Sequence, residues 1–307
     1  MAPGMTTTSP ELQLLDLPSP FRPNFSRLRV IEPPGTPPLA LFKRLLDETY
    51  DKPFIIEDNK LRSLHFSFKY TQSAMRIDQP DALDIRYTQK MMGFLLFERH
   101  PARIVMLGLG GGSLAKFCYR ALPQAGIAVV EINPYVIALR QHFAIPEDDR
   151  RFRVIHGDAG EFIAATPDPI DVLLVDAFDV HGLAHSLAKR EFLQQVYARL
   201  SVAGILVMNL AGDKSGYVSL IRESNDVFDG RTILVSVNRD ENYVLFAFKR
   251  PHFKPDWSEL KRSARDLKVE FGLDFPAFAQ MMELAATGKA MTGCGRRHQT
   301  KISDNVV

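Results

Sequence analysis

Short runs of apolar residues alternate along the chain with stretches in which apolar and polar residues recur at helical spacing. Short, mostly apolar runs bounded by polar or turn residues are typical of buried strands. They lie at residues 104–107, 153–156, 171–176 and 204–210 and in the segment that ends at Glu131. Helical patterns separate them, at residues 113–121, 134–143, 160–165 and 189–200. Strands that alternate with helices predict an α/β fold built on a parallel sheet.

The last two predicted strands break this alternation. They lie at residues 231–237 and 243–249, and only residues 238–242 connect them. Such a short connection leaves no room for a helical crossover, so the two strands are expected to pair antiparallel. The pattern therefore predicts a mostly parallel, seven-stranded sheet that closes in an antiparallel C-terminal hairpin.

A glycine-rich turn follows the first strand of this predicted sheet. Gly108, Gly110 and Gly111 lie directly before the helix at 113–121, and Glu131 ends the next strand, 21 residues after Gly110. Glycines allow the backbone to approach a ligand, the helix amides point toward it, and an acid at the second strand end accepts hydrogen bonds from ribose hydroxyls. The segment predicts a site for an adenosine-containing molecule. The alternative is a tight turn without a ligand, since Ser113 stands where the dinucleotide motif has its third glycine.

Acidic residues also follow two other predicted strands. Asp158 and Ala159 come after the strand at 153–156, and Asp176 and Asp179 come after the strand at 171–176. In open α/β sheets, ligands bind at the carboxyl ends of the strands. These residues are therefore expected to lie around the same site as the glycine turn. The alternative for the two later acids is an ordinary solvated loop.

Composition divides the chain into four parts. Residues 1–38 are rich in proline, serine and threonine and predict a flexible arm. Residues 39–83 predict a small β unit, because β-like runs at 54–57 and 61–69 flank a turn at 58–60. Residues 84–250 predict the Rossmann-like nucleotide-binding catalytic domain. Residues 251–307 predict a helical C-terminal extension with a disordered tail.

Charge, cysteine and histidine content narrow the possible binding partners, the cellular location and the possible metal sites. The formal net charge is +2, which gives no reason to expect binding to nucleic acid or to an anionic membrane. No apolar run reaches the ~18 residues of a membrane span. Cys118 and Cys294 are far apart, which suits a reducing, cytoplasmic location. His181 and His185 have the spacing of a metal pair, but Gly182 between them favours a loop, and no metal site is expected.

Several of these motifs together resemble the spermidine synthase family of polyamine aminopropyltransferases. They are G-x-G-G-G after the first strand, V-E-I-N, G-D-A and V-D-A-F-D, and the similarity covers residues 54–249. The segment at 72–92 is similar to the bacterial spermidine-synthase-like subset. The resemblance implies a Rossmann-like fold of the adenosylmethionine-dependent methyltransferase type, preceded by a small N-terminal β unit. It also implies a homodimer with the β unit at the interface.

The resemblance further implies an activity and roles for individual residues. An aminopropyl group would pass from decarboxylated S-adenosylmethionine, as co-substrate, to a di- or polyamine, with release of methylthioadenosine and without a tightly bound cofactor. Asp176 would act as the base, and Asp179 would hold an amine of the acceptor. The other implied contacts are Gln72 and Tyr87 to the substrate, Glu131 to the ribose, Asp158 to the adenine, and Gly108, Gly110, Gly111 and Ala159 elsewhere around the nucleotide.

The chain departs from the family pattern at positions that contact the substrates. Gly111 stands where the family has an aspartate that binds the aminopropyl amine, and Thr88 and Gln89 replace a histidine and a glutamate. Phe178 and Val180 flank Asp179 in place of a small polar residue and a proline. Two alternatives therefore stay open: a methyltransferase that uses intact S-adenosylmethionine, and a non-catalytic relative that binds the nucleotide without turnover.

Overall fold

A computed structural model describes residues 13–19, 26–179, 182–211, 214–237 and 242–288. Its larger sheet has the strand order β13-β14-β12-β9-β6-β7-β8. Neighbours from β12 to β8 pair parallel, whereas β14 pairs antiparallel with both β12 and β13. This confirms the predicted sheet. The strands are β6 (Arg103–Leu107), β7 (Gly126–Glu131), β8 (Phe152–His156), β9 (Ile170–Val175), β12 (Leu200–Leu210), β13 (Thr232–Val237) and β14 (Asn242–Phe248).

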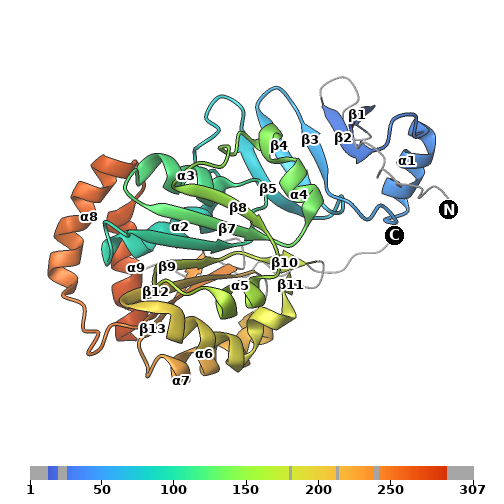
Figure 1. The fold of residues 1–307 in the computed structure, drawn as a ribbon. Helices are drawn as coiled ribbons and strands as arrows, with labels where there is room; N and C mark the ends of the chain where they lie inside the picture. The colour runs from blue at the N-terminus through green and yellow to red at the C-terminus, as the bar shows by residue number, and fades with distance from the viewer. Residues whose placement is uncertain (1–12, 20–25, 180–181, 212–213, 238–241, 289–307) are drawn as a thin grey trace, which may run out of the picture.

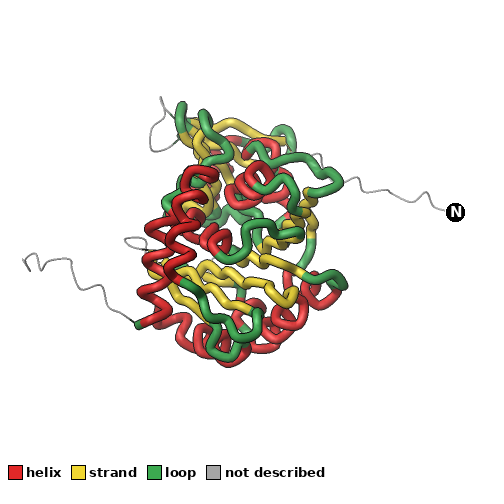
Figure 2. Tube along the Cα trace, turned by 90° about the vertical axis from the view of Figure 1, so that its left-hand side faces the viewer, coloured by secondary structure: helices red, strands yellow, loops and turns green. Residues whose placement is uncertain are grey.

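Helices cover both faces of the larger sheet. Alternate residues of β6 face opposite sides, so Ile104 and Met106 join one apolar cluster while Val105 and Leu107 join another. The first cluster includes residues of α2 (Arg86–Met91), α3 (Ser113–Ala121), α8 (Trp257–Phe271) and α9 (Phe275–Thr287). The second includes residues of α5 (Ala159–Ala165), α6 (Arg190–Arg199) and α7 (Val218–Val227). The result is a three-layer α/β/α domain (Figures 1 and 2).

A second, antiparallel sheet lies beside this domain at its N-terminal end (Figure 1). Its strands follow chain order: β1 (Gln13–Pro18), β2 (Arg27–Glu32), β3 (Phe54–Glu57), β4 (Leu61–His65) and β5 (Thr71–Arg76). Helix α1 (Pro38–Leu46) packs on it, because Leu41 and Leu45 share an apolar cluster with Leu28, Val30 and Phe54. The small sheet therefore has an apolar core of its own.

The prediction of a flexible arm at residues 1–38 is wrong for the part of that segment that the structure describes. Strand β2 buries Leu28 and Val30, and Arg27 and Arg29, which alternate with them, lie on the other face. The surrounding prolines and serines hid this alternation of period two. Strand β1 then completes the sheet as its edge strand, and its Pro18 lies at the strand end, where no further ladder bond is needed.

Some predicted elements are shorter than the sequence indicated. The helix predicted at 134–143 is α4 (Pro134–Ala138) followed by the 3-10 turn η2 (Arg140–Phe143). Helix α2 is likewise short and continues as the 3-10 turn η1 (Met92–Leu96). The pattern missed β5 and α7. Within the described residues, none of the helices has the length and apolar character that crossing a membrane requires.

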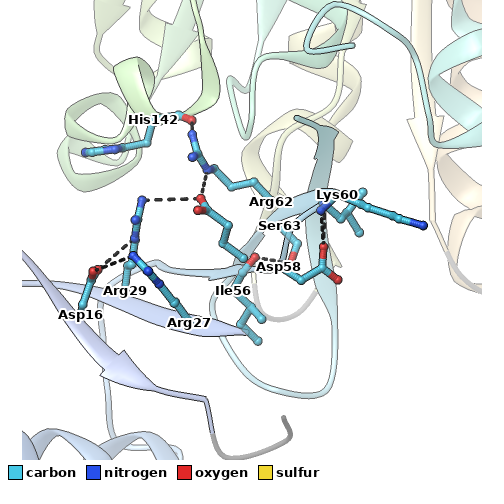
Figure 3. A network of polar contacts seen from close by, with 11 residues as sticks. Asp16, Arg27, Arg29, Ile56, Asp58, Lys60, Arg62, Ser63 and His142 are labelled. Atoms are coloured by element: carbon cyan, nitrogen blue, oxygen red, sulfur yellow. Dashed lines mark hydrogen bonds and ion pairs between the residues drawn. The ribbon is translucent and has the colours of Figure 1, made fainter. Parts of the chain in front are cut away.

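Polar contacts tie the small sheet to the last residues of η2. Arg62 of β4 extends toward η2 and donates to the carbonyl oxygen of His142 (Figure 3). Glu57 holds the Arg62 guanidinium from the other side and also pairs with Arg29, at 3.5 Å. From the larger domain, Lys116 of α3 donates to the next carbonyl oxygen, that of Phe143, at 2.7 Å. Two adjacent carbonyls are thus held by one cation from the small sheet and one from α3 of the larger domain.

Lys116 makes stability depend on pH. Its side chain is 1% exposed, and burial lowers its pKa to about 8. Between pH 8 and the ordinary lysine value near 10.5, the folded protein releases this proton while the unfolded chain retains it. Stability from this group therefore rises with pH over that range. Relative to K116M, we expect the wild-type free energy of unfolding to increase by about 3 kcal/mol, measured by urea unfolding from pH 7 to 10.5.

K60M removes the charge of an exposed lysine and controls for the change in net charge. If K116M and the wild-type protein show the same dependence of unfolding free energy on pH, Lys116 does not titrate in this range in the folded state.

Candidate active site

A cavity of about 1170 Å³ opens at the carboxyl ends of the parallel strands. Its wall combines residues of the larger sheet, α2, β5 and the loop between β4 and β5. Most of the sequence-predicted site residues line it. These are Gln72, Tyr87, Gly108, Gly110, Glu131, Asp158, Ala159 and Asp176. The topology therefore brings together groups that lie up to 104 positions apart in the chain (72 to 176).

The glycine turn and the end of β9 touch through their backbones. Gly108 has φ +97, and a Cβ atom placed on it would collide with the carbonyl oxygen of Asp176. Strands β6 and β9 are neighbours in the sheet, and the amide of Asp176 donates to the carbonyl oxygen of Leu107 at 2.9 Å. A residue with a side chain at position 108 would therefore separate the turn from Asp176.

Gly111 lies in the same turn, and a side chain there would require its neighbours to shift. A Cβ atom there would lie 2.6 Å from the Ser73 hydroxyl oxygen and 3.0 Å from a ring carbon of Phe143. Ser73 belongs to β5 and lines the cavity. An aspartate at position 111 would need Ser73 and Phe143 to move, so a glycine here matches the close packing of the small sheet against the turn.

Glu131 ends β7 and is 9% exposed. One carboxylate oxygen accepts from the amide of Leu109 at 2.9 Å, and the other accepts from the amide of Asn133 at 2.8 Å. These bonds fix the carboxylate at the glycine turn. Each carboxylate oxygen has a second lone-pair site, so the group can still accept from two hydroxyls of a ligand.

Asp158 follows β8 and caps the N-terminus of α5. Its Oδ1 accepts from the amide of Glu161 at 3.0 Å, which satisfies one of the free amides of the first helical turn. Asp158 and Ala159 both line the cavity. The cap orients the carboxyl group while leaving its second oxygen able to accept from a ligand.

Asp176 is held by two side-chain donors. The Tyr87 hydroxyl donates to Oδ2 at 2.9 Å, and the Asn209 amide donates to Oδ1 at 2.9 Å. Burial raises the pKa of Asp176 above its ordinary value, and the two hydrogen bonds oppose that shift. Burial and the nearby Asp176 charge raise the pKa of Tyr87 well above its ordinary value, so Tyr87 remains a donor. The arrangement provides an oriented carboxylate with increased proton affinity.

Sequence reasoning missed Asn209. It lies at the end of β12, is 2% exposed, and its own amide oxygen accepts from Asn242 of β14 at 3.4 Å. The sequence feature that could have identified Asn209 is that it is the single polar side chain in the otherwise apolar segment 204–210. Buried polar side chains are nearly always hydrogen-bonded, so such an amide indicates a polar partner at the strand end.

The loop after Asp176 is described only in part. Phe178–Asp179 forms the short strand β10, which pairs with β11 (Gly182–Leu183), and Phe178 lines the cavity. The side chain of Asp179 and the residue His181 lie outside the described part of the chain. Within that part, no group of three or more His, Cys, Asp or Glu side chains is arranged to hold a metal ion.

The fold and the cavity define a class: Rossmann-like α/β proteins of the methyltransferase type, whose ligand site lies at the carboxyl ends of the parallel strands. Comparison with known proteins narrows this class. The model of the spermine/spermidine synthase domain matches residues 84–214. The polyamine aminopropyltransferase of Chromobacterium violaceum is 35% identical over 231 residues, which are 75% of this chain and 88% of that protein. The chain therefore belongs to the spermine/spermidine synthase family, which confirms the resemblance found in its motifs.

Solved structures with the same fold include enzymes of two kinds. A probable spermidine synthase from Corynebacterium glutamicum has a TM-score of 0.56 at 17% identity and covers 96% of this chain and 100% of its own. Human methyltransferase-like protein 13, in complex with SAH, has a TM-score of 0.56 at 23% identity and covers 61% of this chain and 93% of its own. At these identities the likeness concerns the fold alone.

The close contact between Gly108 and Asp176 predicts that a single methyl group added at position 108 strongly destabilises the fold. We expect G108A to lower the free energy of unfolding by several kcal/mol, because the side chain combines an unfavourable positive φ with a backbone collision. Chemical unfolding monitored by circular dichroism measures this. The matched control is G126A in β7, where the nearest neighbour of the added carbon lies 3.6 Å away. Equal stability of the two variants would contradict the close approach.

Proposed function

We propose that this protein is a spermidine synthase-like aminopropyltransferase, which transfers an aminopropyl group from decarboxylated S-adenosylmethionine to a di- or polyamine. The observation that carries the proposal is the Asp176 carboxylate, hydrogen-bonded on both oxygens by Tyr87 and Asn209 at the wall of the cavity. Family membership supports the reaction class.

In the proposed reaction, the acceptor nitrogen attacks the methylene carbon bonded to the sulfonium sulfur. A carbon–nitrogen bond forms, the carbon–sulfur bond breaks, and its electron pair stays on sulfur, which leaves as the neutral thioether of methylthioadenosine. Before the attack, the acceptor ammonium passes a proton to Asp176, whose raised pKa favours accepting it, and this frees the lone pair of the nitrogen. No bound cofactor is needed, because the sulfonium is itself a leaving group.

The remaining predicted residues have binding roles in this proposal. Glu131 accepts hydrogen bonds from the ribose, Asp158 accepts one from the adenine amino group, and Ala159 and the turn with Gly108, Gly110 and Gly111 contact the nucleoside. Gln72 lines the acceptor part of the cavity, and Asp179 holds an amine of the acceptor. The lining positions of Gln72, Glu131 and Asp158 support these roles.

A second candidate is a methyltransferase that uses intact S-adenosylmethionine. One observation favours it: at Gly111 there is no carboxylate to repel the carboxylate of that donor, and one could be placed there only if Ser73 and Phe143 moved. A methyltransferase, however, has no evident need for an acidic cavity wall that holds an amine.

We also propose that the protein is a cytoplasmic homodimer that uses the N-terminal sheet and α1 at its interface. Leu39 and Leu46 of α1 are 83% and 61% exposed and would supply apolar surface to such an interface. The only other partner in this proposal is the small-molecule polyamine; nucleic acid and membrane are not among the partners.

The products distinguish the candidate functions. Purified protein is incubated with decarboxylated S-adenosylmethionine or with S-adenosylmethionine, each with a panel of amines, and the products are identified by mass spectrometry. We expect methylthioadenosine and an amine lengthened by one aminopropyl group. D176N should lower the rate about a hundredfold or more, because it removes the base, whereas D266N, an exposed carboxylate of α8, should not.

Adenosylhomocysteine from the intact donor would instead make the protein a methyltransferase. Absence of turnover with either donor, together with binding of methylthioadenosine, would make it a non-catalytic relative.

The dependence of activity on pH tests how Asp176 is held. The amide of Asn209 lowers the Asp176 pKa, so N209A should raise it. The acid limb of kcat/KM should then move to higher pH by about one unit, since a hydrogen bond to a charged group is worth about 1.5 kcal/mol. N225A in α7, remote from the cavity wall, is the matched control. An unchanged acid limb in N209A would argue that Asn209 does not stabilise the ionised form of Asp176.

A further inference from the structure

The cavity wall carries an uneven distribution of charge. Among the described residues that line it, Glu48, Glu131, Asp158 and Asp176 are acidic, and Lys69 is the only lysine or arginine. An acidic wall attracts a cationic acceptor, whereas a lysine on that wall would repel it. The one cation on this wall therefore requires an explanation.

Lys69 is paired with Glu48. Its ammonium lies 2.9 Å from one carboxylate oxygen of Glu48 and 3.0 Å from the other. Glu48 lies just beyond the end of α1, and Lys69 lies in the loop between β4 and β5, so the pair bridges two segments of the small sheet unit. The Glu48 carboxylate holds the pKa of Lys69 above its ordinary value, and the lysine stays charged.

The ion pair between Lys69 and Glu48 can be broken at little energetic cost. The Lys69 side chain is 64% exposed and that of Glu48 is 48% exposed. Ion pairs this open to solvent gain little net energy, because water screens the charges and both side chains lose freedom. A second ammonium that arrives inside the cavity can replace the lysine at the carboxylate with little loss, while Lys69 turns into solvent.

A polyamine presents such an ammonium. When one nitrogen reacts at Asp176, the protonated nitrogens farther along the molecule need a carboxylate elsewhere on the wall. Phe66 and Tyr70, in the same loop as Lys69, also line the cavity and offer aromatic surface to the methylene chain and the ammonium.

We propose that Glu48 is the binding site for the distal ammonium of the acceptor, and that Lys69 is a built-in competitor which the acceptor displaces. The inference rests on the proposed function and adds a specificity-determining residue to it. It requires that acceptors with a second ammonium at the correct distance be selected over monoamines. Lys69 lowers the affinity only of acceptors that must displace it from Glu48, and it leaves acceptors that cannot reach Glu48 unaffected.

The experiment compares wild type, E48Q and K69M with a series of linear diamines of increasing length and a monoamine. For the diamine length that spans the two carboxylates, E48Q should raise the acceptor KM about fivefold, and K69M should lower it by a similar factor. The kcat values and the KM of the donor should not change, because neither residue contacts the reacting atoms. The monoamine should respond to neither substitution.

Calorimetric titration of the same amines into protein saturated with methylthioadenosine measures the subsite without turnover. Weaker diamine binding in E48Q and tighter binding in K69M would support the subsite even if the wild-type protein formed no product, a result that would defeat only the proposed function. The inference is overturned if E48Q leaves the affinity unchanged at every diamine length. It is also overturned if E48Q and K69M weaken binding equally, because the pair would then be merely structural.

Discussion

The backbone contact between Gly108 and Asp176 is the constraint on which the site depends. Neighbouring parallel strands bring their ends to one edge of the sheet, but they do not by themselves bring the glycine turn and a carboxylate into contact. Here the absence of a side chain at position 108 permits that contact. Tyr87 from α2 and Asn209 from β12 then fix the orientation of the carboxylate. The position and orientation of the proposed base are thus fixed by the glycine turn, α2 and β12.

The larger sheet was predictable because its strands carry strong patterns. Mostly apolar runs indicated the strands, and the acidic residues that follow them marked where the strands end. Because neighbouring strand ends lie side by side, they form one wall of the cavity. The residues that complete the site were harder to find, since their partners are distant in sequence. Asn209 lies 33 positions from Asp176, and only pairing between β12 and β9 brings them together.

The small sheet was less predictable for a different reason. Strands β1 and β2 lie within a proline-rich segment, and their burial depends on α1 and β3, which follow later in the chain. Local composition cannot report such pairing. Strand β5 was also missed, although it carries Gln72 and Ser73, two residues of the cavity wall. The errors therefore concentrate where tertiary contacts decide the structure.

The contacts at the end of η2 have a consequence for how such chains change in evolution. Arg62 and Lys116 hold its last two carbonyls, while Phe143 and Ser73 together fill the space around Gly111. A change at any one of these positions alters the fit of the others. A chimera that joined the small sheet of one homologue to the larger domain of another would separate Ser73 from the turn with which it is packed. Residues on both sides of that junction are therefore expected to be inherited together.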